Sequence, residues 1–397
     1  AGKLAKWCAM SSRPVSAAGK NLKRTSLDRD ALNTIHRVLL GAEHDFPAPW
    51  LAGFAFRERG MLCGLRQREG GPCGVLAAVQ AYVLRELLSR EGAVPLALVT
   101  REDAGDALVA ALSHIIWSAR VGRLATVASC TSGRLPPLRE ASGAIDCTQC
   151  SSAADVSAAV RAVIGLYMRP DGPGIILLLY SLVLTRGLAM VQRDADFPTP
   201  LIGTNGYCAQ ELVNLLLVGR AHSNVFDGEK TVGGDDGCGD GARLRGIPRK
   251  APVGFLTLFE RQGQAGHPLL VVGKNLKKPL APVYVVQSES HYSCLWVEGP
   301  SPPDLSAADG EAAVGADDGE EEDEEEAAME GGPDCAFDVS YFDQMAERDE
   351  AVRLTIRRRP PSVPVPECST ALPPLENVIL TRWPGGEVDW NGEEIIL

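Results

Sequence analysis

The stretch 64–90 joins a glycine-rich turn to a long run of apolar residues, with one cysteine at the junction. Gly70, Gly71 and Pro72 directly precede Cys73. Beyond the cysteine, apolar residues recur every three or four positions, and this spacing predicts a helix with a buried face. The recurring residues are Leu76, Val79, Val83 and Leu87, with Leu84 and Leu88 beside them. The rest of the chain must supply the core around this helix.

The position of Cys73 favours a reactive thiol. Backbone N–H groups in the first turn of a helix lack partners within the helix, and with the helix dipole they stabilise a thiolate, which is the nucleophilic form. Glycine adopts backbone angles that other residues resist, so the preceding turn leaves room for a substrate. Gln67, six residues earlier, can direct an amide N–H towards the oxyanion formed by attack on a carbonyl. The alternative interpretation is a small, buried core cysteine.

A nucleophilic cysteine needs a base, and His291 is the best placed of the six histidines. It stands between a β-rich run at 283–286 and a second run at 292–297, so we expect it at the edge of a pair of strands. The other histidines fall in helix patterns or predicted loops. A cysteine followed far downstream by a histidine is the order found in papain-like thiol hydrolases, whose two residues meet in space.

Four motifs carry a resemblance to a known family. The first is GLRQREGGPCGVLAAVQ at 64–80, and the second is LIGTNGYCAQELVNLLLVGRAHSNVFDG at 201–228. VYVVQSESHYSCLW follows at 283–296, and TRWPGGEVDWNG closes the series at 381–392. In this order they resemble the MINDY family of deubiquitinases, above all its fourth-member branch, which includes the B-type paralogue. The resemblance runs from about residue 26 to the end of the chain, with one insertion.

The resemblance implies a cysteine isopeptidase that trims ubiquitin chains and prefers lysine-48 linkages. It implies Cys73 as the nucleophile, His291 as the general base and Gln67 as the oxyanion donor. A third residue should orient His291, and three polar residues remain candidates for this role. They are Glu289, Asp389 and Asn391.

The expected fold is a single α/β domain of the α+β kind, papain-like in plan. The nucleophile stands at the N-terminus of a helix, and His291 stands on a sheet. The ubiquitin tail is flexible and ends in two glycines, so it needs a narrow slot. The glycines expected to line that slot are Gly70, Gly71 and Gly74.

Two segments are expected to lie outside the packed domain. Residues 1–25 show little periodicity and are predicted to be a flexible N-terminal tail, which leaves 26–397 as the deubiquitinase catalytic domain. Residues 301–334 are predicted to be an acidic, disordered insertion, because fourteen acidic side chains repel one another and few apolar residues are present to pack. Docking of this segment to a basic partner is the alternative interpretation.

Charge and cysteine content limit the functional classes. The net charge is −12, but the acidic segment makes all of it, and the remainder is near neutral. Charge therefore gives no reason to expect nucleic-acid or membrane binding. Eleven cysteines without a disulfide pattern favour a reducing compartment, the cytoplasm or the nucleus. The apolar run 175–184 is too short to cross a bilayer. We expect a monomer that needs no metal or other cofactor.

Several local patterns predict structure away from the site. Asp28 followed by an apolar stripe predicts a helix to residue 40, with Gly41 as its stop. Residues 378–382 and 387–391 flank Pro384-Gly385-Gly386, which suggests a hairpin. The Cys147–Cys150 pair lacks the second pair of ligands that a structural zinc site needs, so a metal or redox role is disfavoured.

Two further functions remain open beside the deubiquitinase. The first is a ubiquitin-binding scaffold of the same family that has lost catalysis, and it predicts chain binding without cleavage. The retained Gln67, Cys73 and His291 favour the enzyme. The second is a thiol hydrolase that acts on another small amide, and it predicts no reaction with ubiquitin.

Overall fold

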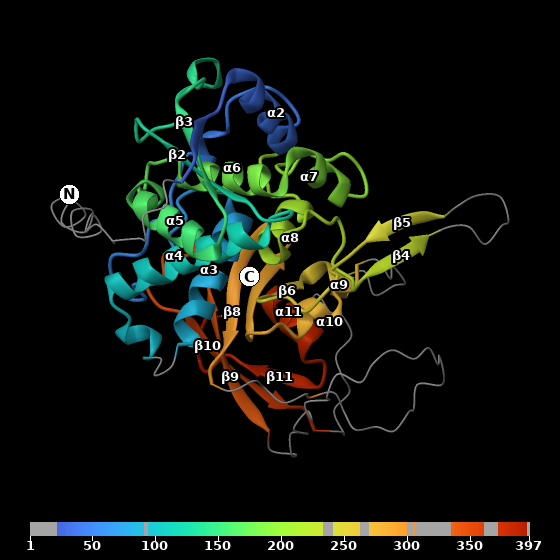
Figure 1. The fold of residues 1–397 in the computed structure, drawn as a ribbon. Coiled ribbons are helices and arrows are strands. Elements are labelled where there is room, and N and C mark those ends of the chain that lie inside the picture. The colour runs from blue at the N-terminus through green and yellow to red at the C-terminus, as the bar shows by residue number, and fades with distance from the viewer. Residues whose placement is uncertain are drawn as a thin grey trace.

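The structure is a computed structural model that describes residues 22–90, 94–232, 241–262, 270–299, 305, 335–360 and 372–394. Helices and one large sheet make up most of this part of the chain (Figure 1). The helices are α2 (Arg29–Leu40), α3 (Cys73–Leu88), α4 (Arg101–Ser118), α5 (Ala153–Tyr167), α6 (Gly174–Arg186), α7 (Leu188–Asp194), α8 (Gln210–Val218), α9 (Leu258–Gln262), α10 (Lys274–Lys277) and α11 (Pro374–Arg382). The fold class is α+β, as expected.

The strands form three sheets within the described residues. They are β1 (Arg24–Ser26), β2 (Ala125–Cys130), β3 (Ile145–Cys150), β4 (Glu229–Val232), β5 (Ala242–Arg245), β6 (Gly254–Thr257), β7 (Val283–Ser288), β8 (His291–Val297), β9 (Ala336–Phe342), β10 (Val352–Arg358) and β11 (Gly386–Asp389). The large sheet has the order β11-β10-β9-β8-β7-β6, and only its β6–β7 pair is parallel. The smaller sheets are β1-β3-β2 and β4-β5.

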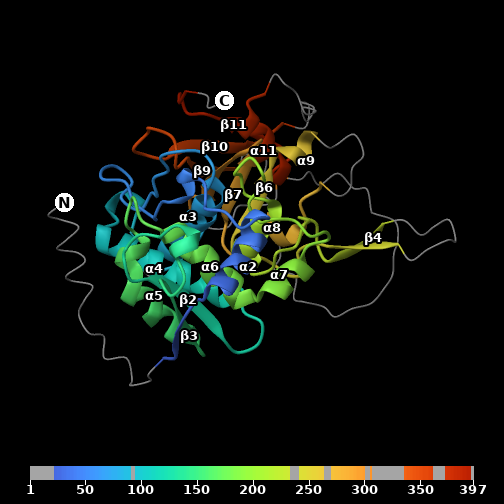
Figure 2. The ribbon, with the colours of Figure 1, turned by 90° about the horizontal axis from the view of Figure 1, so that it is seen from above.

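Helix α3 lies between the large sheet and a layer of helices. It contacts β7 and β8 on one side and α4 and α8 on the other. Figure 2 shows the same arrangement from above, with the orange and red strands on one side of α3 and α4, α5 and α6 on the opposite side. Thirteen of the sixteen residues of α3 are buried. The predicted helix is confirmed, and it is apolar on nearly every face because it is covered on nearly every face.

Local signals predicted α2 correctly and failed at α11. Helix α2 begins after Asp28, whose side chain accepts a hydrogen bond from the Ala31 N–H, and it ends at Gly41 with φ +74°. The expected hairpin around residue 385 is wrong, because residues 378–382 are helical. Pro373 and Pro374 start that helix, and Val378 and Ile379 pack into a second core behind the sheet.

The two segments expected outside the domain fall mostly beyond the described residues. Of the predicted tail, 1–21 are not described, whereas Arg24 and Thr25 pair with β3 and so belong to the fold. Of the predicted acidic insertion, Leu305 is described and is 1% exposed within the second core. Leu305 therefore belongs to the packed domain, and the rest of the predicted insertion lies outside the described residues.

The apolar run 175–184 lies within α6, whose side chains are nearly all buried inside the protein. No single helix of the described ranges is long and apolar enough to cross a membrane. Helices α6 and α7 meet the length and composition requirements only as a pair, and the chain bends by 86° between them.

Gly219, at the C-terminus of α8, tests the close packing of α8 on α4. Its φ is +72°, and an added Cβ would lie 2.2 Å from the Ser118 carbonyl oxygen. We expect Gly219→Ala to lower the free energy of unfolding by about 2 kcal/mol, as measured by urea denaturation. Gly122→Ala is the matched control, because Gly122 has φ +79° but open space around it. It should cost only about 1 kcal/mol, and equal losses in both variants would contradict the packing argument.

Candidate active site

The loop before α3 is held to the helix by a buried glutamine. Gln80, which is fully buried, accepts a hydrogen bond from the Leu65 N–H at 2.6 Å and donates one to the Cys63 carbonyl at 3.1 Å. Leu65 also forms a β-bridge with Phe56. These contacts fix the direction in which the chain approaches Gln67 and the turn that follows it.

The turn at Gly70 and Gly71 requires glycine at its second position. Gly71 has φ +123°, and an added Cβ would lie 3.3 Å from the Trp50 indole nitrogen and 3.4 Å from the Gly206 carbonyl oxygen. The same indole donates a hydrogen bond to Gly206 at 3.0 Å. Gly70 is exposed, and the space around it is open. A substrate can therefore approach the turn at Gly70, whereas Trp50 and Gly206 block the approach at Gly71.

Cys73 is the first residue of α3 and is 2% exposed. Its Sγ lies 3.9 Å from the Gly71 carbonyl oxygen and 3.6 Å from the Ser290 carbonyl oxygen. The second of these contacts joins the helix to the turn between β7 and β8. The thiol thus stands where the helical part of the protein meets the large sheet.

Gly74, expected to line the substrate slot, is instead a packing position. It is buried, and an added Cβ would lie 2.9 Å from the Cys208 Sγ. That sulfur lies 3.8 Å from the Gly71 carbonyl oxygen, on the same turn that Cys73 faces. Burial raises the pKa of the Cys208 thiol. Cys208 therefore packs against the turn as a neutral thiol.

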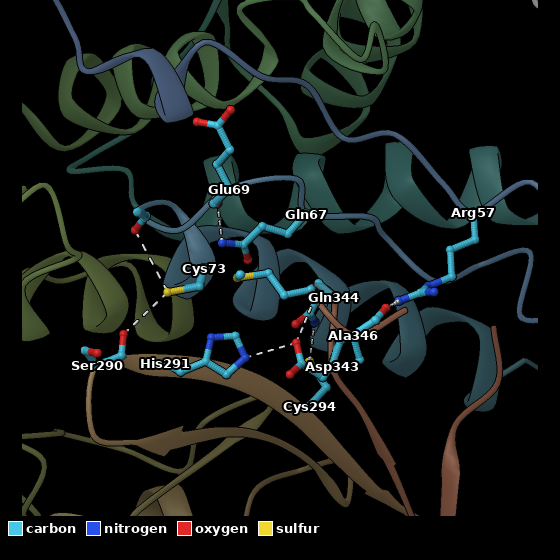
Figure 3. Close-up of polar contacts among 12 residues, drawn as sticks. Arg57, Gln67, Glu69, Cys73, Ser290, His291, Cys294, Asp343, Gln344 and Ala346 are labelled. Atoms are coloured by element: carbon cyan, nitrogen blue, oxygen red, sulfur yellow. Dashed lines mark hydrogen bonds and ion pairs between the residues drawn. The ribbon is translucent and has the colours of Figure 1, made fainter. Parts of the chain in front are cut away.

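His291 is the first residue of β8, as the sequence predicts. Its Nε2 lies 3.0 Å from the Asp343 Oδ1. In Figure 3 the imidazole ring stands between the Cys73 sulfur and the Asp343 carboxylate. Burial lowers the pKa of His291, but hydrogen bonds to Asp343 and Cys73 and the charges of both outweigh burial and raise it to about 10. The surroundings therefore favour a protonated imidazole.

Asp343 orients His291, and none of the three candidates from the sequence does so. It follows β9 directly, and β9 pairs with the strand that carries the histidine. Its Oδ1 also accepts a hydrogen bond from the Met345 N–H at 2.8 Å. Burial raises the pKa of Asp343, but the hydrogen bond and charge of His291 and nearby backbone N–H groups lower it overall. Asp343 is therefore held as a carboxylate beside the His291 imidazole.

The three sequence candidates for this role lie in other places. Glu289 occupies the turn before His291 with φ +54°. Asp389 forms an ion pair with Arg357 at 3.0 Å, and the Asn391 side chain donates to the Arg353 carbonyl at 3.0 Å. The last two belong to the edge of the sheet around β11, and β9 and β10 separate that edge from β8. The only local signal for Asp343 was a carboxylate directly after a strand.

Gln67 lies near Cys73 in Figure 3 and is 5% exposed. Its backbone N–H donates to the Gln344 carbonyl at 2.9 Å, so the strand end that carries Asp343 also holds Gln67. Its side-chain Nε2 donates to the Glu69 carbonyl at 2.8 Å, which engages one of the two N–H groups of the amide. The fold brings Gln67, Cys73 and His291 to one place.

A pocket of about 220 Å³ borders the outer side of this loop. Gln67, Glu69 and Pro72 form the wall nearest the site, and apolar side chains such as Leu51 and Phe56 line much of the rest. No cluster of three or more metal-ligating side chains occurs in the described ranges. The chemistry offered by the site is that of a thiol, an imidazole and a carboxylate in series, which suits nucleophilic attack on a carbonyl.

The His291–Asp343 pair should make stability depend on pH. Folding raises the pKa of His291 from 6.5 to about 10, so its contribution is complete below pH 6.5 and is lost as pH rises through 10. Folding lowers the pKa of Asp343, so its carboxylate stabilises the folded protein at pH values above its ordinary pKa of 3.8. Asp343→Asn should therefore lower the free energy of unfolding most at about pH 6, as measured by urea denaturation, and least at about pH 10.

Asp389→Asn is the control for this prediction, because it removes an exposed carboxylate on the same sheet that lies away from His291. It should show no such pH dependence. A loss for Asp343→Asn that is equal at the two pH values would contradict the pairing. The imidazole titration of His291, followed by NMR, gives an independent reading.

Comparison with known proteins gives independent evidence on the family of this chain. A family model described as "Deubiquitinating enzyme MINDY-3/4, conserved domain" matches residues 36–301 and 325–392. The chain is 36% identical over 388 residues to the mouse (Mus musculus) "Probable ubiquitin carboxyl-terminal hydrolase MINDY-4", which covers 94% of this chain and 47% of that protein. The human (Homo sapiens) protein of the same name is 34% identical over 385 residues, with 94% and 46% covered.

More distant similarity reaches a second group of proteins. The Drosophila melanogaster "Ubiquitin carboxyl-terminal hydrolase MINDY-3 homolog" is 29% identical over 329 residues, which covers 68% of this chain and 56% of that protein. The chain spans about half the length of the curated relatives it matches. No solved structure matches it. From the family model and the long similarity to the MINDY-4 proteins, the chain belongs to the MINDY-3/4 family of deubiquitinating enzymes, in its MINDY-4 branch.

Proposed function

We propose that this chain is a cysteine deubiquitinase that hydrolyses isopeptide bonds in lysine-48-linked polyubiquitin. The observation that carries the proposal is the series Cys73, His291 and Asp343, with Gln67 beside the sulfur. Membership of the family and the names of its relatives as ubiquitin carboxyl-terminal hydrolases support ubiquitin as the substrate. The lysine-48 preference is supported by the resemblance of the motifs to the family.

The geometry assigns each residue a step. The Cys73 sulfur attacks the carbonyl carbon of the isopeptide bond that follows the last glycine of ubiquitin. The thiol proton goes to the imidazole nitrogen of His291 that faces the sulfur, because the other nitrogen is held by Asp343. Because its pKa is raised, His291 already holds this proton before the sulfur attacks. Backbone N–H groups at the start of α3 and the free N–H of Gln67 stabilise the oxyanion.

The second half of the reaction uses the same groups. Collapse of the tetrahedral intermediate breaks the C–N bond, and His291 gives its proton to the departing lysine amine. A thioester between Cys73 and the ubiquitin carbonyl remains. Water then attacks this thioester, with His291 as the base, and releases the carboxylate and the thiol. Asp343 keeps the imidazole in one orientation during both proton transfers.

The surroundings of the sulfur support a narrow approach for the substrate. Gly70 leaves open space on the outer side of the turn, whereas Gly71 and Gly74 lie against Trp50 and Cys208. We therefore assign the contact with the two terminal glycines of ubiquitin to Gly70. The neighbouring pocket of about 220 Å³ offers room for the residues that precede them.

The proposal also covers the compartment in which the protein acts and the partners that it binds. The cysteines of the described ranges are all free thiols. This supports a reducing compartment, the cytoplasm or the nucleus, in which a nucleophilic thiol remains usable. We propose ubiquitin chains as the partners of a monomeric protein that binds neither nucleic acid nor a membrane.

Two contacts of the Cys73 sulfur favour the alternative, a ubiquitin-binding scaffold without catalysis. The carbonyl oxygens of Gly71 and Ser290 both face the Cys73 sulfur. Such oxygens accept a hydrogen bond from a thiol and repel a thiolate. A scaffold would keep this arrangement when a chain binds, whereas an enzyme must turn at least one of these oxygens away.

The reaction can be tested on purified ubiquitin tetramers of two linkages. We expect the protein to shorten lysine-48-linked tetramers and to leave lysine-63-linked tetramers intact on gels. Cys73→Ala should abolish cleavage and leave the thermal midpoint nearly unchanged, because it removes only the nucleophile. Binding of chains without cleavage of either linkage by the unmodified protein would favour the scaffold.

The role of Gln67 can be measured separately. If its amide stabilises the oxyanion, Gln67→Ala should lower kcat roughly 10²–10³-fold on the cleaved chain. Gln192→Ala is the matched control, because Gln192 is exposed on α7, and it should leave kcat unchanged. An unaltered kcat for Gln67→Ala would remove this role from the mechanism.

A further inference from the structure

A buried arginine lies behind the segment that carries Asp343. Arg57 is 6% exposed and belongs to the chain segment that leads into the loop before α3. Its guanidinium contacts a distant part of the chain, since Asp343 lies 286 positions further along the sequence. The mechanism described above makes no use of this cation.

The guanidinium donates hydrogen bonds to three carbonyl groups of one short turn. Nη1 lies 2.5 Å from the Arg348 carbonyl oxygen. Nη2 lies 2.7 Å from the Ala346 carbonyl oxygen and 3.1 Å from that of Asp343. Figure 3 shows Arg57 joined to Ala346 on the side of the turn away from His291. Phe342 is the last residue before this turn, and the Arg57 Cζ atom lies 4.9 Å from the centroid of its ring.

The same turn is bound to the loop before α3 by its backbone. The Gln67 N–H donates to the Gln344 carbonyl at 2.9 Å, and the Met61 N–H donates to the Asp349 carbonyl at 2.8 Å. Gly64 lies so close to Phe342 that an added Cβ would stand 2.5 Å from the ring. The turn and the loop are therefore a single packed unit with Arg57 at its centre.

Burying a cation costs free energy unless the cation is paired or hydrogen-bonded. In the described ranges these three hydrogen bonds of Arg57 go to carbonyl oxygens, whereas the ordinary partners of an arginine are carboxylates. A planar guanidinium can bridge three carbonyls at once, and a lysine ammonium cannot do so with the same geometry. An arginine in this place is suited to holding a turn in one shape.

We propose that Arg57 is a positioning residue of the active site. It fixes the turn 343–348, so that the Asp343 carboxylate stays on the His291 Nε2 and the Gln344 carbonyl stays on the Gln67 backbone. One side chain thereby sets the relative positions of the base and the oxyanion donor. This inference rests on the proposed function only for its effect on turnover.

The expected consequence follows from the charges that face these groups. Asp343, Asp349 and Arg66 act on Arg57, and Asp343 and Cys73 act on His291. If the turn relaxes, Asp343 moves from the imidazole and the pKa of His291 falls. An imidazolium favours the reaction of a neighbouring thiol near neutral pH, so a smaller imidazolium population should slow the alkylation of Cys73 there.

The test measures the alkylation of Cys73 by iodoacetamide as a function of pH, with peptide mass spectrometry to separate it from the other cysteines. This reaction needs no ubiquitin, so its outcome is independent of the proposed substrate. Arg57→Gln should lower the rate near neutral pH at least tenfold and move the midpoint of the profile upward by about one unit. Arg57→Lys, which keeps the charge, should recover part of the loss.

Two controls separate positioning from general destabilisation. Arg59→Gln removes an exposed cation that pairs with Asp349, the residue after the same turn, and it should leave the profile unchanged. Val378→Ala makes a cavity in the second core, away from the site, so it should lower the thermal midpoint without moving the profile. An unshifted profile in folded Arg57→Gln would overturn the proposal.

A double-mutant cycle decides the matter if Arg57→Gln does not fold. Arg57→Lys is compared in the native background and in Asp343→Asn. If Arg57 acts through Asp343, the effect of the lysine on the alkylation profile should disappear in the Asp343→Asn background. Full additivity of the two substitutions would overturn the proposal. On cleaved chains the effect should fall on kcat, about 10²-fold for Arg57→Gln, because positioning acts on the reacting groups.

Discussion

Helix α3 is held on nearly all sides, and this burial gives its first residue a fixed position. Polar groups within the helix are satisfied by their neighbours, so burial carries little penalty for them. Tyr82 donates to the Leu217 carbonyl at 2.6 Å, which ties α3 to α8. On the other face, the Cys294 thiol of β8 donates to the Ala77 carbonyl at 3.1 Å. A thiol at the end of so constrained a helix can be approached only from the loop and the sheet.

The partners of that thiol come together because adjacent antiparallel strands share an end. His291 begins β8, and Asp343 follows the last residue of β9, so strand pairing brings both residues to the same end of these strands. The loop before α3 contacts the same strand ends through Gln67 and Arg57. Three segments that are distant in the sequence therefore contribute groups to a site that no segment could form alone.

The sequence predicted what depends on local order. Periodicity identified α3, and the order of residue types placed Cys73, Gln67 and His291 in one site. It could not identify Asp343, because that role is created by the pairing of two strands about fifty residues apart rather than by any nearby pattern. The expected hairpin at 378–382 failed for the same reason, since packing of an apolar face against the sheet overrode the turn signal. Tertiary contacts decided both outcomes.

The position of the acidic stretch has a consequence for how the family can vary. The family model omits residues 302–324, which lie between β8 and β9. These residues join the ends of the two strands opposite to His291 and Asp343, roughly 20 Å away along strands of seven residues. Doubling the length of a loop costs only about 0.6 kcal/mol in closure entropy. Leu305 is buried in the second core, so the packed part of the protein includes this point of the connection. The connection is therefore free to change in length while the chemistry stays the same.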